Sequence, residues 1–333
     1  VLGWAPGLGA PGAFALDALS LVFALIAVLV GAGVLHYSGA YFAGKPGAGK
    51  VGATLLAFLA SLLGVVLADD LITLFIAWEA TGACSFLLIG FHGERASARI
   101  GARRAMLVTA GGALPMLVGF LILADAAGST RLTELGQANL EPATLGLVAA
   151  LVLVGALTKS AQVPFTSWLP GAMAAPAPIS ALLHAATLVK AGVFLVARFA
   201  PVLGDAPGWS ETLIVLGVAT TAAGGFGALM QTDIKRLLAF TTIAGLGAPM
   251  VLLGFGTPAA AAAALLLVLA HALYKSALFL AAGSLEKAAG TRELSLLGGV
   301  GRAQPILGAT LLAASFSMAG LAPALGFAGK ELG

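Results

Sequence analysis

The stretch LTKSAQVPFTSWLP, residues 157–170, places a lysine and two prolines within a long apolar segment. Lys159 follows a mainly hydrophobic run that begins near residue 145. Pro164 and Pro170 lack the amide hydrogen that a continuing helix needs, and in a membrane the carbonyls left free must be satisfied by protein or trapped water. If this segment lies in a membrane, the sequence predicts a helix that is interrupted just after Lys159.

The composition of the whole chain indicates a membrane protein. Of the 333 residues, 60% are hydrophobic and only 9% are charged, and the mean hydropathy is +1.04. A soluble globular protein carries about 25% charged residues. These values exclude a soluble enzyme, a nucleic-acid-binding protein and a disordered chain. The single cysteine, Cys84, excludes a disulfide framework and a cysteine metal site, and we interpret it as a small buried hydrophobe.

A membrane helix needs about 20 mainly apolar residues, and ten segments of this chain meet that requirement. They lie at residues 14–37, 51–68, 71–91, 105–124, 145–165, 179–199, 211–230, 237–254, 262–283 and 305–328. The predicted fold class is therefore all-α, a polytopic membrane protein with about ten transmembrane helices. No cleavable signal is evident, and we interpret the chain as an internal piece of a longer protein.

The basic residues are distributed unevenly between alternate loops. If the loop 38–50 lies inside the cell, the loops 92–104, 166–178, 231–236 and 284–304 lie inside as well. These loops hold eleven basic residues: Lys45, Lys50, Arg95, Arg99, Arg103, Arg104, Lys235, Arg236, Lys287, Arg292 and Arg302. The outer loops hold only Arg131 and Arg198. By the positive-inside rule, the chain begins outside.

Several ionisable residues remain within the spans. They are Glu79, Lys159, His184, Lys190, His271, Lys275 and, near the end of the last span, Lys330. Each charge at mid-membrane costs at least about 2.5–3.5 kcal/mol. Interhelical ion pairs are one explanation, but one central carboxylate cannot pair with three central lysines. We therefore interpret these residues as a proton relay.

The spacing of the histidines adds detail to this interpretation. His271 and Lys275 are four residues apart and share one helix face. His184 and Lys190 are six apart, so they are expected to face different neighbours. Taken alone, His184 could also be a satisfied core histidine.

A second stretch, SMAGLAPALGFAGKE at residues 317–331, repeats the first pattern with Pro323 and Lys330. Two interrupted helices, each with a lysine, are typical of inverted repeats at transporter ion sites. We predict a leading helix and loop over residues 1–50, a first repeat over 51–199 and a second repeat over 200–333.

Four stretches resemble the proton-translocating antiporter-like family. They are LADDLITLFIAWEATGACSFLLIGF (67–91), LTKSAQVPFTSWLPGAMAAPAPISALLHAATLVKAGVFLVAR (157–198), QTDIKRLLAFTTIAGLG (231–247) and HALYKSALFLAAGSLEKAAGTREL (271–294). The family includes the large membrane subunits of respiratory complex I and the A and D subunits of Mrp-type cation/proton antiporters. Within it, LVKAG with Lys190 and the stretch 317–331 look most like the Mrp A subunits.

The resemblance implies roles for single residues. Glu79 matches a glutamate that modulates a lysine on the first interrupted helix, here Lys159. His271 and Lys275 match the central histidine and lysine of the second repeat, and Lys330 matches the lysine on the second interrupted helix. The chain departs from the usual pattern at Thr166, Ala177 and Ala322, where a histidine, a threonine and a second proline are common.

The resemblance also implies a function and partners. It implies a proton-translocating subunit of a multisubunit Na⁺(cation)/H⁺ antiporter, a secondary transporter and not an enzyme, in the bacterial cell membrane. The implied partners are the other Mrp subunits, MrpB to MrpG with the homologous MrpD among them, the ions H⁺ and Na⁺, and the lipid bilayer. No cofactor, metal site or nucleic acid is expected.

Two other functions stay open at this stage. The chain could be an antiporter-like subunit of complex I or a related membrane hydrogenase, pumping protons on redox energy. It could also be a structural membrane scaffold, whose buried lysines would be dispensable. The sequence does not place a sodium path, because Na⁺ prefers oxygen ligands and Glu79 is the only central carboxylate.

Overall fold

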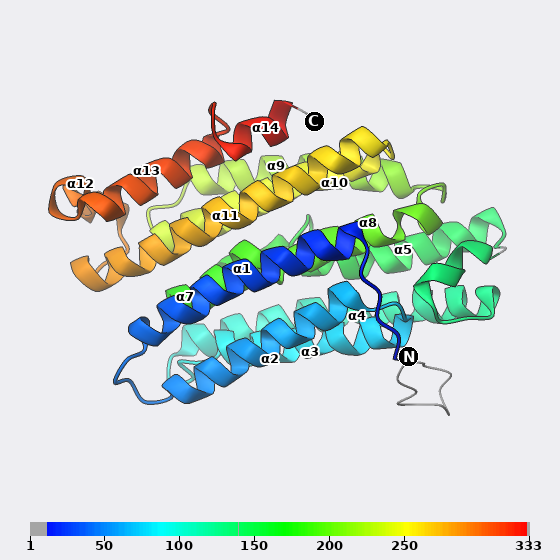
Figure 1. Ribbon diagram of the computed structural model, residues 1–333, viewed down its shortest axis with the longest axis horizontal. Helices are drawn as coiled ribbons and strands as arrows, with labels where there is room; N and C mark the ends of the chain where they lie inside the picture. Colours follow the sequence, from blue (N-terminus) through cyan, green and yellow to red (C-terminus); the bar gives the residue numbers. More distant parts are fainter. Residues whose placement is uncertain (1–11, 139, 332–333) are drawn as a thin grey trace.

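The computed structural model of the chain describes residues 12–138 and 140–331. All named regular elements of these residues are helical, and most helices run side by side in one bundle (Figure 1). Helices α11, α13 and α14 lie on one side of the bundle, and α2, α3 and α4 lie on the other. The predicted all-α fold class is confirmed.

Nine helical segments of the described residues are long and apolar enough to cross a membrane. Eight are single helices: α1 (Ala18–Tyr41), α2 (Ala48–Leu67), α3 (Leu71–Ile89), α4 (Ala96–Ala127), α5 (Pro142–Lys159), α9 (Trp209–Leu229), α10 (Ile234–Gly254) and α11 (Pro258–Ala289). The remaining one is composite and comprises α7 (Ala177–Ser180), the π-helix η5 (Ala181–Ala186) and α8 (Lys190–Leu203).

The tenth predicted span, 305–328, is two helices instead of one. α13 (Pro305–Ala319) ends before Gly320, whose φ of +74° stops the helix, and the chain resumes as α14 (Leu325–Glu331). The short elements η2 (Leu132–Gln137), η3 (Phe165–Ser167), α6 (Trp168–Gly171), η4 (Ala172–Ala174), η6 (Leu294–Leu296) and α12 (Val300–Ala303) lie in the connections.

Some predicted boundaries are wrong because helices continue beyond the apolar run. Asp233 caps α10 by accepting hydrogen bonds from the amides of Lys235 and Arg236, so both basic residues lie in the first turn of the helix and not in a loop. Arg198 likewise lies within α8. The first turns of α4 carry Arg99, Arg103 and Arg104, which the prediction assigned to the preceding loop.

The loops predicted to share one side of the membrane do meet at one end of the bundle. Ser97, Pro170, Arg236 and Arg292 come from four of the predicted inner segments, and all of them line one pocket. Residues at the opposite helix ends, including Asp69, Thr133 and Arg198, line another pocket. The alternation of the loops is therefore confirmed for these segments.

Charged pairs close the end of the bundle that the charge distribution predicts to lie outside, which we call the outer end, the opposite end being the inner end. Arg131 binds Asp69 at 2.7 Å, and Arg198 of α8 binds Asp17, the N-cap of α1, at 2.5 Å. The Arg198 guanidinium holds the pKa of the Asp17 carboxyl well below its usual range, mainly through this hydrogen bond. Arg198 also donates to Ser20 Oγ at 2.7 Å. These contacts link α8 to the start of α1.

One local arrangement occurs at both ends of the bundle. At the outer end, the Leu71 amide donates to the Thr130 carbonyl at 2.9 Å, beside the Arg131–Asp69 pair. At the inner end, the Ile234 amide donates to the Arg292 carbonyl at 3.0 Å. There Arg292 Nε binds the carboxylate of Asp233 at 3.1 Å. In both places an aspartate at or just before a helix start pairs with an arginine that follows a long helix, α4 or α11.

Glycines allow α9 and α10 to pack with their backbones in contact. A Cβ atom on Gly224 would lie 2.8 Å from the Phe240 carbonyl oxygen, and one on Gly217 would lie 2.8 Å from the Gly247 carbonyl oxygen. A Cβ on the neighbouring Gly225 would meet open space. Small residues at such contacts are the usual device of helix packing in membranes.

This packing predicts opposite effects for two adjacent substitutions. Gly224→Ala forces a methyl group against the backbone of α10 and should destabilise the protein by about 1–3 kcal/mol. Gly225→Ala meets no neighbour and gains helix propensity, so it should be neutral or stabilising by up to about 1 kcal/mol. Thermal unfolding of the purified protein measures both. Equal effects of the two substitutions would contradict the close α9–α10 contact.

Candidate functional site

The interruption of the fifth long helix is built by polar side chains that satisfy its free backbone groups. α5 ends at Lys159, and the chain then turns through Ala161, which has a positive φ of 52°. Trp168 Nε1 donates to the Thr158 carbonyl at 3.0 Å, and the Val163 amide donates to Thr220 Oγ1 of α9 at 2.9 Å. These bonds replace the helical ladder where it stops.

The prolines that we associate with the two breaks lie outside the long helices. Pro164 precedes η3, Pro170 lies in α6, and Pro323 lies between α13 and α14. The peptide bonds before Pro164 and Pro323 are cis.

Lys159 is fully buried at the end of α5, and a backbone carbonyl accepts a hydrogen bond from its ammonium group. Nζ donates to the Trp78 carbonyl of α3 at 2.9 Å and lies 4.8 Å from the centroid of the Trp78 ring. Its exposed fraction is 1%. A Cβ on Gly82 would lie 3.9 Å from Nζ, so this glycine also borders the ammonium.

Glu79 is adjacent to this contact but does not form an ion pair with Lys159. The side chain is half-buried on α3, and among the described residues no Lys, Arg or His nitrogen lies within 4.0 Å of its carboxylate. The charges of Glu79 and Lys159 still interact at longer range. The predicted partners are therefore neighbours in this structure, and the pair is open.

A further discontinuity lies between α7 and α8, where the sequence predicts one continuous span. The π-helix η5 ends at Ala186 and is followed by Thr187, with φ −135° and ψ −79°, before α8 begins at Lys190. Thr187 Oγ1 donates to the Leu182 carbonyl at 2.6 Å, and Lys190 Nζ donates to the Ala185 carbonyl. π-Helical turns are often found at functional sites.

Lys190 connects this discontinuity to α11. Its Nζ lies 3.0 Å from Nδ1 of His271, and both side chains are buried. Gly245 of α10 makes room for the imidazole, since a Cβ there would lie 2.7 Å from His271 Cδ2. His271 Nε2 has no hydrogen-bond partner in the described part of the chain. An imidazole with one nitrogen on a lysine and one free can exchange a proton in either direction.

Lys275, one turn beyond His271 on α11, points to α10. Its Nζ donates to the Leu238 carbonyl at 3.2 Å and to Thr241 Oγ1. The two residues share one helix, as predicted, but no direct hydrogen bond joins them in the residues that the structure describes.

The buried residues around Lys159 and those around Lys190 meet where α5 and α8 touch. A Cβ on Gly192 of α8 would lie 2.8 Å from the Ser160 Cβ that follows Lys159. Lys190 lies only two residues before Gly192. The close approach therefore brings the segments that carry Lys159 and Lys190 side by side. α5 packs on α8, and the π-helix η5 packs on α11. The Lys159 ammonium reaches α3 and the Lys190 ammonium reaches α11, so these side-chain contacts form a series from α3 to α11.

His184 lies in η5, fully buried, against the ring of Trp168 at a centroid distance of 6.0 Å. Within the described residues, neither of its ring nitrogens has a hydrogen-bond partner. The interpretation of His184 as a satisfied core histidine is therefore not supported by its contacts.

The sequence reasoning missed Lys235. It is 1% exposed, and its Nζ donates to the Ala175 carbonyl in the connection after the first break. Asp233 is a helix N-cap signal that moves the helix start to Ile234. Reading that signal would have placed Lys235 on the buried face that also carries Leu238 and Thr242.

Lys330 lies in α14, but its side chain is outside what the structure describes. α14 packs closely on its neighbours through glycines. A Cβ on Gly326 would collide with the Ser317 carbonyl of α13, and one on Gly329 would lie 2.8 Å from Leu267 of α11. The helix that carries Lys330 thus lies against α11, which carries His271 and Lys275.

One rule applies to the four lysines that are buried among the described side chains. A backbone carbonyl accepts a hydrogen bond from each of their ammonium groups. The acceptor is Trp78 for Lys159, Ala185 for Lys190, Ala175 for Lys235 and Leu238 for Lys275. A carbonyl is a neutral acceptor, so it can hold an ammonium without fixing it in an ion pair. This arrangement can hold protons inside the bundle and release them.

Comparisons with known proteins agree with this architecture. The family described as NADH:quinone oxidoreductase/Mrp antiporter, TM, matches residues 68–332. A probable K(+)/H(+) antiporter A/B protein of Rhizobium meliloti is 43% identical over 99% of this chain and 33% of its own length. A Na(+)/H(+) antiporter A1 protein of Staphylococcus haemolyticus is 38% identical over 99% of this chain and 43% of its own length.

Solved structures show the same fold. The Mrp complex from Dietzia sp. DQ12-45-1b contains a chain that is 41% identical, with a TM-score of 0.92, over 99% of this chain and 36% of its own. The membrane-bound sulfane sulfur reductase, an archaeal respiratory membrane complex, contains a chain that is 25% identical, with a TM-score of 0.85. The match covers 93% of this chain and 65% of that one. The chain thus spans less than half the length of these antiporter relatives.

The contact between Lys190 and His271 predicts a non-additive double-mutant cycle. Lys190→Met or His271→Phe alone leaves the other buried polar group without its partner and should cost about 1–3 kcal/mol. The double variant removes both groups, so it should be about as stable as the wild type or only slightly less so. Thermal unfolding of the purified complex measures the cycle. Strictly additive losses would show that the two side chains do not interact.

Proposed function

The chain belongs to the NADH:quinone oxidoreductase/Mrp antiporter family, and from this membership we propose that it moves protons laterally through the middle of the membrane. We assign it to an A-type component, MrpA, of a multisubunit cation/proton antiporter in the bacterial plasma membrane. It is then a part of a multi-pass secondary transporter and not of an enzyme. The observation that carries the proposal is the buried series Lys159, Lys190, His271 and Lys275 on neighbouring helices.

The proposed relay begins with the Glu79–Lys159 pair. When the carboxylate contacts the ammonium, it stabilises the protonated lysine. When the pair is open, as in this structure, Lys159 rests only on the Trp78 carbonyl in a desolvated site and can release its proton. The α5–α8 contact then brings the next acceptor, Lys190, to the same region.

The second part of the relay is the step through His271. Lys190 and Nδ1 of His271 exchange a proton across 3.0 Å, and the free Nε2 can accept or donate another by way of water. Lys275, one turn away, is the next site, and α14 with Lys330 packs against the same helix. His184, with both nitrogens free of protein partners, is proposed as a branch of this path beside Lys235.

We also propose that the two halves of the chain are inverted repeats, over about 51–199 and 200–333. The paired aspartate and arginine that recur at opposite ends of the bundle support this division. So do the two long helices α4 and α11, each ending at a glycine with positive φ and followed by such an arginine. Each half then contributes one of the two interrupted helices that carry a lysine: the one that breaks after Lys159, and the one that breaks between α13 and α14.

The other Mrp subunits, MrpB to MrpG, are the proposed partners, with H⁺ and a monovalent cation as the transported ions. The similar proteins are named for both K⁺ and Na⁺, so similarity alone does not choose between these cations. The proposed relay assigns Glu79, the one central carboxylate of the predicted spans, to the modulation of Lys159, so we propose that the cation crosses in a part of the complex beyond this chain.

A redox-driven proton pump is the second candidate, because the sulfane sulfur reductase complex contains a chain of the same fold. The higher identity to the Mrp chain, 41% against 25%, favours the antiporter. The two differ in what drives proton flux: an added Na⁺ or K⁺ gradient for the antiporter, and an electron donor for the pump.

The proposal is tested with Lys159→Ala in the complete complex reconstituted in vesicles. Cation-dependent proton flux should fall to the level of empty vesicles, because the relay loses a member that no neighbouring group replaces. The complex should assemble normally, as judged by its subunit composition. Lys50→Ala removes an exposed lysine at the inner end and should transport like the wild type. Unchanged cation extrusion by Lys159→Ala would refute the relay.

A further inference from the structure

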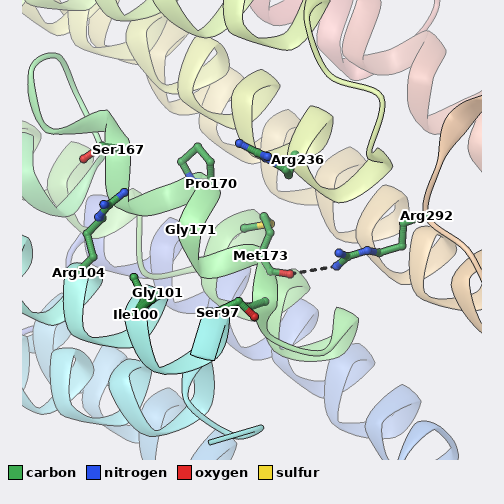
Figure 2. A pocket seen from close by; sticks show the side chains of 11 residues that line it. Ser97, Ile100, Gly101, Arg104, Ser167, Pro170, Gly171, Met173, Arg236 and Arg292 are labelled. Carbon is green, nitrogen blue, oxygen red and sulfur yellow. Dashed lines mark hydrogen bonds between the residues drawn. The ribbon is translucent and has the colours of Figure 1, made fainter. Parts of the chain in front are cut away.

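Three arginines line a pocket at the inner end of the bundle, and none of the described buried lysines lines it. Arg104 comes from α4, Arg236 from the first turn of α10 and Arg292 from the connection after α11. Figure 2 shows Arg236 and Arg292 reaching from one side towards Pro170 and Met173, with Arg104 on the other side near Ser167. The cavity has a volume of 370 Å³.

Two of these arginines are free to bind a ligand. The guanidinium groups of Arg104 and Arg236 are exposed and have no hydrogen bond or ion pair within the described residues. Arg292 is held in place, since it binds Asp233 at 3.1 Å and donates to the Met173 carbonyl at 3.4 Å. No carboxylate is among the described residues that line the cavity. The positive charges of Arg104 and Arg236 are therefore not neutralised by a carboxylate of the pocket.

The rest of the lining is suited to a lipid headgroup. Ser97 and Ser167 add hydroxyl donors, and Ile100, Pro170 and Met173 add an apolar wall. Ile100 is 59% exposed on the side of α4, so apolar surface continues from the pocket along the bundle. All the lining segments were predicted to lie on the inner side, where the headgroups of the inner leaflet are found.

We propose that this pocket binds the phosphate group of an anionic phospholipid of the inner leaflet. Guanidinium forks match phosphate oxygens in geometry and charge, and basic pockets between membrane helices on the cytoplasmic side bind anionic headgroups. A soluble phosphate offers the same charge but would leave the apolar wall formed by Ile100 and Met173 uncovered. The wall therefore favours the lipid.

The position of the pocket gives the bound lipid a structural role. Its floor is the contact of Gly101 with Gly171, where the backbone of α4 touches α6 in the connection after the first break. A phosphate that bridges Arg104 and Arg236 links α4 to α10 across this connection. The lipid thereby holds the segment between Lys159 and η5 against its two neighbours.

The test is native mass spectrometry of the complete complex in mild detergent, with added phosphatidylglycerol or phosphatidylcholine. Arg104→Gln with Arg236→Gln should reduce retention of phosphatidylglycerol by about fivefold for each arginine. Retention of phosphatidylcholine should not change. The matched control is Arg103→Gln with Arg302→Gln, which removes two exposed inner arginines outside the pocket and should bind like the wild type.

Other outcomes overturn the proposal. Equal retention of phosphatidylglycerol by the pocket variant and the wild type would show that the arginines only face solvent. Retention of inorganic phosphate by the wild type, together with equal retention of the two lipids, would assign the pocket to a free anion. Loss of another protein of the complex from the pocket variant would show that an acidic protein surface covers the arginines.

Discussion

The cost of removing an ammonium from water is the constraint on which the rest of this structure depends. Lys159, Lys190, Lys235 and Lys275 are each at most 1% exposed, and no carboxylate among the described residues lies within 4.0 Å of any of them. Backbone carbonyls take that place. The Trp78 and Leu238 carbonyls belong to regular helices and have a second lone pair to offer, whereas those of Ala185 and Ala175 lie at interruptions. The irregular backbone and the buried charge therefore support one another.

This constraint explains what the sequence could and could not predict. Long apolar runs fix the positions of the spans, and Pro164 marks the break after Lys159, so both follow from the chemistry of single segments. The contact of Lys190 with His271 does not, because it depends on the π-helix that precedes Lys190. The spacing argument assumed a regular helix of 3.6 residues per turn, and η5 breaks that assumption. Lys235 was missed because an apolar run marks the membrane-spanning length of a helix and does not include its capped first turn.

The family comparison and the geometry contribute separate parts of the account. Membership of the NADH:quinone oxidoreductase/Mrp antiporter family accounts for the fold. An Mrp complex and a respiratory complex both contain this fold, so the fold itself does not define what drives proton movement. The geometry adds an ordered set of contacts from α3 to α11 in which protons can be held on neutral acceptors. The arginine pocket lies outside that set, at the end of the bundle where the predicted inner loops meet. The lipid that we propose there would act on the connection after the first break.

The central claim is that the buried lysines serve proton transfer at the expense of stability. The direct measurement compares proton flux and thermal unfolding for Lys159→Met and Lys275→Met combined in one complex. The account predicts that flux disappears while the unfolding temperature stays the same or rises, because each buried charge costs at least about 2.5–3.5 kcal/mol. A complex that retains proton flux without these lysines, or that unfolds at a lower temperature because it has lost essential structural contacts, would contradict the account.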